Sequence, residues 1–130
     1  MKDGKVVILV VDDSFPDYKW KWEYQLPDGV EVVSTTELEK GRRIFRERIQ
    51  EIDIVVIDHQ VIGGTTPELV REIKASEFKG VLIGVSFTNL RALQDAGCDY
   101  VCDRNNLFPD ESIGTIGHLT EEIKRVRRRS

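Results

Sequence analysis

Cysteine is scarce in this 130-residue chain, and long apolar runs are missing. The two cysteines, Cys98 and Cys102, are too few for a disulfide framework. Together with His59 and His118 they show no zinc-ligand spacing, so we interpret both as small packing residues. No stretch is long enough to span a bilayer, and the polar segment 1–5 does not fit a secretory signal. These absences predict a reduced, cytoplasmic protein with no membrane partner.

Positive charge is also in deficit. Lysine and arginine total 19 against 23 aspartates and glutamates, which gives a formal net charge of −4. This balance argues against a nucleic-acid-binding module, because such modules are usually basic. The basic segment 124–129 is the exception. We interpret it as a solvated helix end whose cations suit the helix dipole, with a phosphate-binding tail as the alternative.

What the chain does contain is an alternation of short apolar runs and longer amphipathic segments. The runs predicted as strands are 6–11, 30–33, 54–57, 81–85 and 100–102. Between them, Thr36 and Glu39 form a capping-box pattern and Thr66-Pro67 forms a helix start. A short helix is expected over 90–96. The last helix is expected to carry Ile116, Leu119, Ile123 and Val126 on its apolar face.

Strands that alternate with helices predict an α/β fold with a parallel sheet and right-handed crossovers, in one domain spanning residues 1–130. We take its five strands in the order of the flavodoxin-like (βα)5 doubly wound sheet, 2-1-3-4-5, with helices on both faces.

The segment 17–26 is open to two interpretations. Its aromatic residues alternate with polar ones at the spacing of a strand: Tyr18, Trp20, Trp22 and Tyr24. Phe15, Tyr18 and Trp22 also match one face of a helix that begins near Pro16. The helix continues the strand–helix alternation and is favoured. Trp20 and Tyr24 would then face away from the core as a surface for an output partner, unless they only cover the helix and its neighbours.

Acidic residues follow two of the predicted strands. Asp12 and Asp13 come directly after the first strand, and Asp58 comes directly after the third. These strands would be neighbours where the chain direction switches, a usual ligand-binding position. Three converging carboxylates would repel one another, and Mg²⁺ would relieve the repulsion. Such a site suits phosphoryl transfer, with Asp58 as the attacking group. Taken singly, each aspartate is better explained as a helix cap, and only the three together favour a ligand site.

These residues resemble the receiver domains of two-component response regulators. Segment 10–14 is similar to the family's acidic pair, and 55–58 is similar to the strand that presents the phosphorylated aspartate. The likeness continues through 58–74 and 81–86 to the small-residue turn 96–99, so it spans nearly the whole chain.

The resemblance implies a signalling switch rather than a classical enzyme. Asp58 would accept a phosphoryl group from a sensor histidine kinase or phosphotransfer protein, and Ser86 would be the switch hydroxyl. Mg²⁺ would be held by Asp12, Asp13, Asp58 and the backbone carbonyl of Gln60. The output partner is not identified, and homodimer formation stays open.

The sequence departs from the family at two positions near this site. The family has a lysine after the fifth strand, where this chain offers Arg104 or, with one residue deleted, Asp103. Arginine is not equivalent to lysine at a phosphoryl site. Phe87 stands where a small residue is usual. Two hypotheses follow: a working phosphoacceptor, or a pseudo-receiver that keeps the shape and binds partners without phosphorylation.

Overall fold

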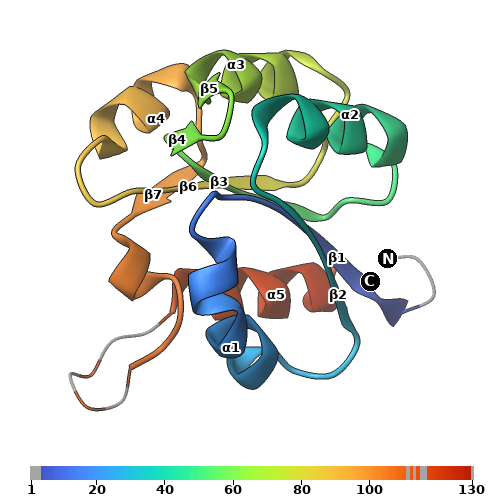
Figure 1. Ribbon diagram of the computed structural model, residues 1–130. Helices are drawn as coiled ribbons and strands as arrows, with labels where there is room; N and C mark the ends of the chain where they lie inside the picture. The colour runs from blue at the N-terminus through green and yellow to red at the C-terminus, as the bar shows by residue number, and fades with distance from the viewer. Residues whose placement is uncertain (1–3, 111, 113, 115–116, 130) are drawn as a thin grey trace.

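The structure is a computed structural model that describes residues 4–110, 112, 114 and 117–129. Its centre is a five-stranded parallel sheet in the order β2-β1-β3-β6-β7 (Figure 1). The strands are β1 (Val6–Val11), β2 (Val30–Thr35), β3 (Ile54–Asp58), β6 (Val81–Val85) and β7 (Tyr100–Cys102). Because β6 and β7 are the fourth and fifth strands of this sheet, the predicted order 2-1-3-4-5 and the flavodoxin-like fold are confirmed.

Helices cover both faces of the sheet. Figure 1 shows α1 (Phe15–Gln25) and α5 (His118–Arg128) on one face, with α2 (Leu38–Arg48), α3 (Pro67–Ala75) and α4 (Leu90–Ala96) on the other. All six residues of β1 are buried. Its side chains alternate between two separate cores, because successive residues of a strand point to opposite faces. This explains why the strand is apolar throughout rather than alternating.

The segment 17–25 is helical, as we favoured, and Leu26 is the extended C-cap of α1. Trp22 is 4% exposed, whereas Trp20 is 58% and Tyr24 87% exposed. The Trp22 ring meets Phe108 edge to face, with ring centroids 5.0 Å apart. Phe108 and its neighbour Leu107 are buried core residues that no periodic pattern marked in the sequence, since they lie in an irregular stretch between β7 and α5.

The capping box predicted at Thr36 and Glu39 is wrong. The N-cap of α2 is Glu37, in an extended conformation, with no side-chain cap. The backbone of this stretch pairs instead with the loop after β3: the Ile62 amide donates to the Thr36 carbonyl, and the Leu38 amide donates to the Ile62 carbonyl, both at 2.9 Å. The helix therefore begins later than the local pattern suggested.

A two-stranded antiparallel hairpin follows β3 and was not predicted. It joins β4 (Gln60–Val61) to β5 (Gly64–Thr65). Gly63 and Gly64 turn the chain with φ angles of 100° and 147°, a region that favours glycine. Two-residue strands carry too little periodicity to be recognised in a sequence.

The remaining elements agree with the prediction where they are described. α4 ends at Gly97, whose φ is 122°. Leu119 and Ile123 of α5 are buried and Val126 is partly buried, while Ile116 lies outside the described residues. Cys98 and Cys102 are unpaired and buried, and burial raises the pKa of their thiols to about 12 and about 11, which makes them inert packing residues. No helix among the described residues has the length and apolarity needed to cross a membrane.

Candidate functional site

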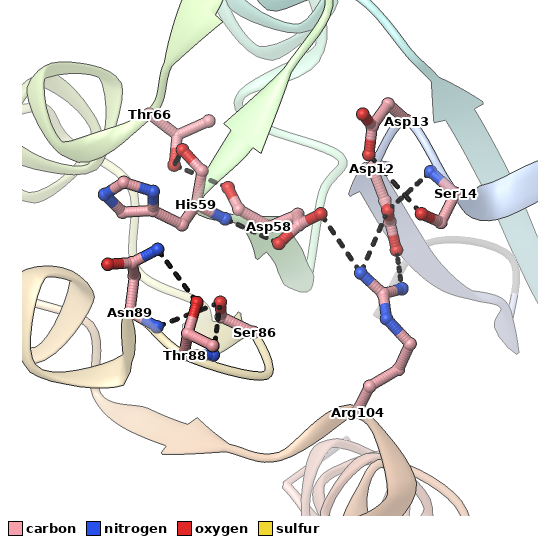
Figure 2. A network of polar contacts seen from close by, with 10 residues as sticks. All are labelled: Asp12, Asp13, Ser14, Asp58, His59, Thr66, Ser86, Thr88, Asn89 and Arg104. Carbon is pink, nitrogen blue, oxygen red and sulfur yellow. Dashed lines mark hydrogen bonds and ion pairs between the residues drawn. The ribbon is translucent and has the colours of Figure 1, made fainter.

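The three predicted aspartates lie together at the carboxyl ends of β1 and β3. The register Val11↔Ile57 brings the last residues of the two strands side by side. Asp12, Asp13 and Asp58 each offer a carboxylate oxygen, and these oxygens lie within 4.8 Å of one another. Asp12 is 3% exposed, Asp58 is partly buried and Asp13 is exposed. The cluster therefore has a buried side and a side open to solvent. Figure 2 shows the three carboxylates and their partners.

Arg104 is the cation that reaches this cluster. It lies in the 3-10 helix Arg104–Asn106 directly after β7, and its side chain is 9% exposed. Its Nη1 pairs with Asp12 Oδ2, and its Nη2 lies 3.0 Å from Asp58 Oδ2 and 3.3 Å from Asp12 Oδ1. Asp103, the other residue considered for this position, points its carboxylate at its own helix and accepts from the Asn105 amide at 2.9 Å. One guanidinium thus bridges two carboxylates (Figure 2).

Backbone amides also hold the carboxylates of Asp12 and Asp58. Asp58 Oδ1 accepts from the amide of His59, and Asp12 Oδ1 accepts from the amide of Ser14, both at 2.8 Å. The carbonyl of Asp58 accepts from the Thr66 hydroxyl at 2.5 Å, which ties the strand end to the start of α3. The carboxylates of Asp12 and Asp58 are therefore fixed in orientation, as a group that attacks or coordinates in one direction requires.

Burial and like charge make Asp58 unusually basic. Burial is the main cause that raises the pKa of Asp58 to about 6, and the negative charge of Asp12 is the second. The charge of Arg104 and the hydrogen bond from the His59 amide lower this pKa but do not cancel the rise. Burial alone would lower the pKa of Arg104. The hydrogen bond from Arg104 to Asp12 and the negative charges of Asp12 and Asp58 outweigh this effect and raise the pKa. One arginine does not fully compensate the cluster, and this leaves residual negative charge for a further cation.

The donor set fits Mg²⁺. All three side-chain ligands are carboxylate oxygens, which this ion prefers, and the exposed Asp13 leaves room for the waters that Mg²⁺ keeps. Gln60, whose carbonyl the resemblance adds to the set, lies in β4, two residues after Asp58. Arg104 is a competitor within the same cluster, because its nitrogens contact oxygens of Asp12 and Asp58.

Ser86 lies beside the site, at the end of β6, and is 7% exposed. Its Oγ accepts from the amides of Thr88 at 3.3 Å and Asn89 at 3.2 Å. The hydroxyl is therefore engaged in holding the loop that leads to α4 (Figure 2).

Two aromatic rings flank Arg104. Its guanidinium carbon lies 5.2 Å from the ring centroid of Tyr18 and 5.6 Å from that of Phe87. Both distances fall within the range of cation–π attraction. Tyr18 belongs to α1 and Phe87 to the loop before α4, elements that cover opposite faces of the sheet (Figure 1). Sequence reasoning missed the place of Tyr18 beside the site, because its spacing indicated only a core-facing residue of α1.

Comparisons with solved structures identify the fold as that of receiver domains. A response regulator receiver domain from Clostridium thermocellum superposes with a TM-score of 0.68 at 24% identity, covering 95% of this chain and 95% of that one. The signal receiver domain of an HD domain-containing protein from Pseudomonas fluorescens gives 0.73 at 12% identity, with 99% and 91% covered. The receiver domain of Ssk1 from Saccharomyces cerevisiae, solved with the histidine phosphotransfer protein Ypd1, gives 0.66 at 12%, with 85% and 84% covered.

No family model matches the sequence, and a search of curated proteins finds no match either. The chain nevertheless has the receiver-domain fold over nearly its whole length. At these identities the likeness establishes the architecture, and the chemistry must be argued from the site.

Proposed function

We propose that this chain is a receiver domain that accepts a phosphoryl group on Asp58 and thereby switches a partner-binding surface. The observation that carries the proposal is the meeting of Asp12, Asp13 and Asp58, with oxygens within 4.8 Å, at the carboxyl ends of neighbouring strands. A receiver fold supports it, because sheets of this kind place ligands at the same edge.

In this proposal each residue has a separate task. Asp58 supplies the attacking oxygen, which we assign to Oδ2 because Arg104 lies beside it, whereas Oδ1 accepts from the His59 amide. Arg104, already 3.0 Å from Asp58 Oδ2, stabilises negative charge on the transferred group in place of the family's lysine. Asp12, Asp13, Asp58 and the Gln60 carbonyl would hold Mg²⁺, which neutralises phosphoryl oxygens when bound.

The switch requires Ser86 to change partners. Its hydroxyl holds the amides of Thr88 and Asn89, so turning toward a phosphoryl group on Asp58 would release those amides and let the loop before α4 move. A phosphoryl group supplies the charge and the strong acceptors for such a change.

The phosphoryl donor in this proposal is a sensor histidine kinase or a histidine phosphotransfer protein. The structural neighbour Ssk1 was solved with a protein of the second kind. Trp20 and Tyr24, exposed on α1, are proposed as contacts for the output partner, because large aromatic side chains are enriched at protein interfaces.

A pseudo-receiver is the second candidate. The pairing of the Arg104 guanidinium with both Asp12 and Asp58 favours it. The guanidinium contacts Asp12 and Asp58 where a metal ion would bind, so the site is partly neutralised without one. A domain of this kind would bind its partners without phosphorylation.

Incubation with acetyl phosphate and Mg²⁺, followed by intact-mass measurement, separates the two candidates. The switch proposal predicts one added phosphoryl group in the natural sequence and none in Asp58→Asn. An unchanged mass after long incubation would favour the pseudo-receiver.

A further inference from the structure

We propose that Tyr18 and Phe87 are positioning residues that hold the Arg104 guanidinium across Asp12 and Asp58, so that Arg104 acts as a tethered cation competing with Mg²⁺ for the same carboxylates. We call Tyr18 and Phe87 the aromatic pair. The inference rests on the proposed function in one respect, namely that the carboxylate cluster is where Mg²⁺ binds.

The first support is the incomplete hydrogen bonding of Arg104. Its two Nη atoms contact Asp12 and Asp58, but its Nε is buried and has no hydrogen-bond partner among the described residues. Hydrogen bonds therefore fix only the edge of the guanidinium that carries the two Nη atoms, and not the edge at Nε. The edge at Nε requires another constraint, and the two rings within 5.6 Å provide it.

The second support is the exposure of Phe87. Phe87 is 56% exposed, so packing in the core does not account for this large side chain. Its ring lies over the guanidinium of Arg104, whose side chain is only 9% exposed, and an aromatic face attracts a cation. Tyr18 contributes from α1, so the guanidinium is held by rings from two separate elements.

The third support is the chemistry of the residue that stands in the place of lysine, which has two aromatic rings within cation–π distance. A planar guanidinium stacks on aromatic faces and bridges two carboxylates with its fork, whereas a compact ammonium does neither as well. Phe87 and Arg104 are thus explained together: the bulky residue holds the arginine, and the arginine spans Asp12 and Asp58.

Competition with Mg²⁺ follows from charge and from shared oxygens. Each Arg104 contact occupies lone pairs on carboxylates that Mg²⁺ would use, and a positive charge at this distance lowers the affinity for any second cation. When the rings are removed, Arg104 moves aside more easily and Mg²⁺ binds more tightly.

A double-mutant cycle on Mg²⁺ affinity tests this, with Mg²⁺ alone as the titrant and calorimetry or amide NMR as the readout. Arg104→Gln is expected to bind Mg²⁺ roughly tenfold more tightly than the natural sequence, since one adjacent positive charge is lost. Phe87→Ala and Tyr18→Ala are each expected to tighten binding about threefold, because they act on the same charge indirectly. In the Arg104→Gln background, Phe87→Ala should have no further effect.

The controls separate positioning from general packing. Tyr18→Phe and Phe87→Tyr retain an aromatic face and should keep the natural affinity. Tyr100→Ala removes a partly exposed aromatic residue from the opposite end of β7, where it accepts from Arg125, and should not change Mg²⁺ binding. If Arg104→Gln does not fold, Arg104→Lys replaces it in the cycle, and Phe87→Ala should then change Mg²⁺ affinity less than it does in the natural sequence.

The inference is overturned if Phe87→Ala tightens Mg²⁺ binding equally with and without Arg104, or if Arg104→Gln gains no affinity. An NMR measurement without metal keeps this result distinct from the proposed function. The ring current of Phe87 should shift the Arg104 Nε–H signal in the natural sequence, and this shift should be lost in Phe87→Ala. If the Mg²⁺ affinities follow the predicted cycle but Asp58 is not phosphorylated by acetyl phosphate, only the proposed function is contradicted. If Asp58 is phosphorylated but the Mg²⁺ affinities do not follow the cycle, only this inference is contradicted.

Discussion

Phe87 and Arg104, the two residues near the site at which the resemblance led us to expect departures from receiver domains, contact each other: the guanidinium carbon lies 5.6 Å from the ring centroid. The same guanidinium pairs with Asp12 and lies 3.0 Å from Asp58. Two separate departures in the sequence are therefore one arrangement in space, built around the acidic cluster.

The ion pairs of Arg104 predict a large loss of stability when it is removed. Arg104→Gln leaves Asp12 and Asp58 near each other without their counter-ion, so we expect the free energy of unfolding at pH 7 to fall by about 2–4 kcal/mol. Arg91→Gln is the matched control, because that side chain is 93% exposed and its pair with Asp95 is 3.9 Å long. Urea denaturation without metal measures both, and equal small losses would show that the buried bridge contributes nothing.

Asp58→Asn is expected to stabilise the metal-free protein at neutral pH. The folded-state pKa of about 6 lies above the ordinary value of 3.8, so the folded chain holds this proton more tightly than the unfolded chain does. The natural sequence therefore loses stability as the pH rises from about 4 to 6, and the neutral variant avoids this loss. Above pH 6 the variant should be more stable on the order of 1–2 kcal/mol.

Denaturation in EDTA at several pH values checks this prediction. The two proteins should be nearly equal in stability at pH 4 and should diverge toward pH 7. A difference that does not change with pH would contradict a raised pKa for Asp58.

Two tryptophans in one helix provide a test of the fold. Trp22 is buried against Phe15 and Phe108, so Trp22→Ala should cost about 3–5 kcal/mol. Trp20 is 58% exposed, and Trp20→Ala should cost less than about 1 kcal/mol. If this segment were a strand, Trp20 and Trp22 would share a face, because residues two apart on a strand point to the same side. The two substitutions would then lower the free energy of unfolding by similar amounts. Thermal unfolding of both variants, followed by circular dichroism, distinguishes these cases.

The strands of the sheet were predictable because parallel strands covered on both faces leave continuous apolar runs, as in Val6–Val11. The strand order came from the general pattern of doubly wound sheets and not from these runs. The hairpin Gln60–Thr65 was not predictable, since its strands are two residues long and depend on two glycines with positive φ. The start of α2 was misjudged because a backbone bridge to Ile62, distant in sequence, replaces the side-chain cap.

The convergence of the three aspartates was also predictable, from their positions at neighbouring strand ends. The choice between Arg104 and Asp103 required the structure, because a one-residue shift after β7 decides which side chain faces the cluster. The contacts of Tyr18 and Phe87 with Arg104 join segments that are far apart in the chain. No local sequence pattern could therefore predict them.

The most direct test of the central claim is intact-mass measurement after incubation with acetyl phosphate, with four arms: the natural sequence with Mg²⁺, the natural sequence with EDTA, and the variants Asp58→Asn and Asp13→Asn with Mg²⁺. We predict one added phosphoryl group in the first arm, none in the EDTA and Asp58→Asn arms, and a slower gain in Asp13→Asn, because a metal ligand is lost there. No gain in the first arm, or an equal gain in Asp58→Asn, would contradict the assignment of Asp58 as the phosphoacceptor.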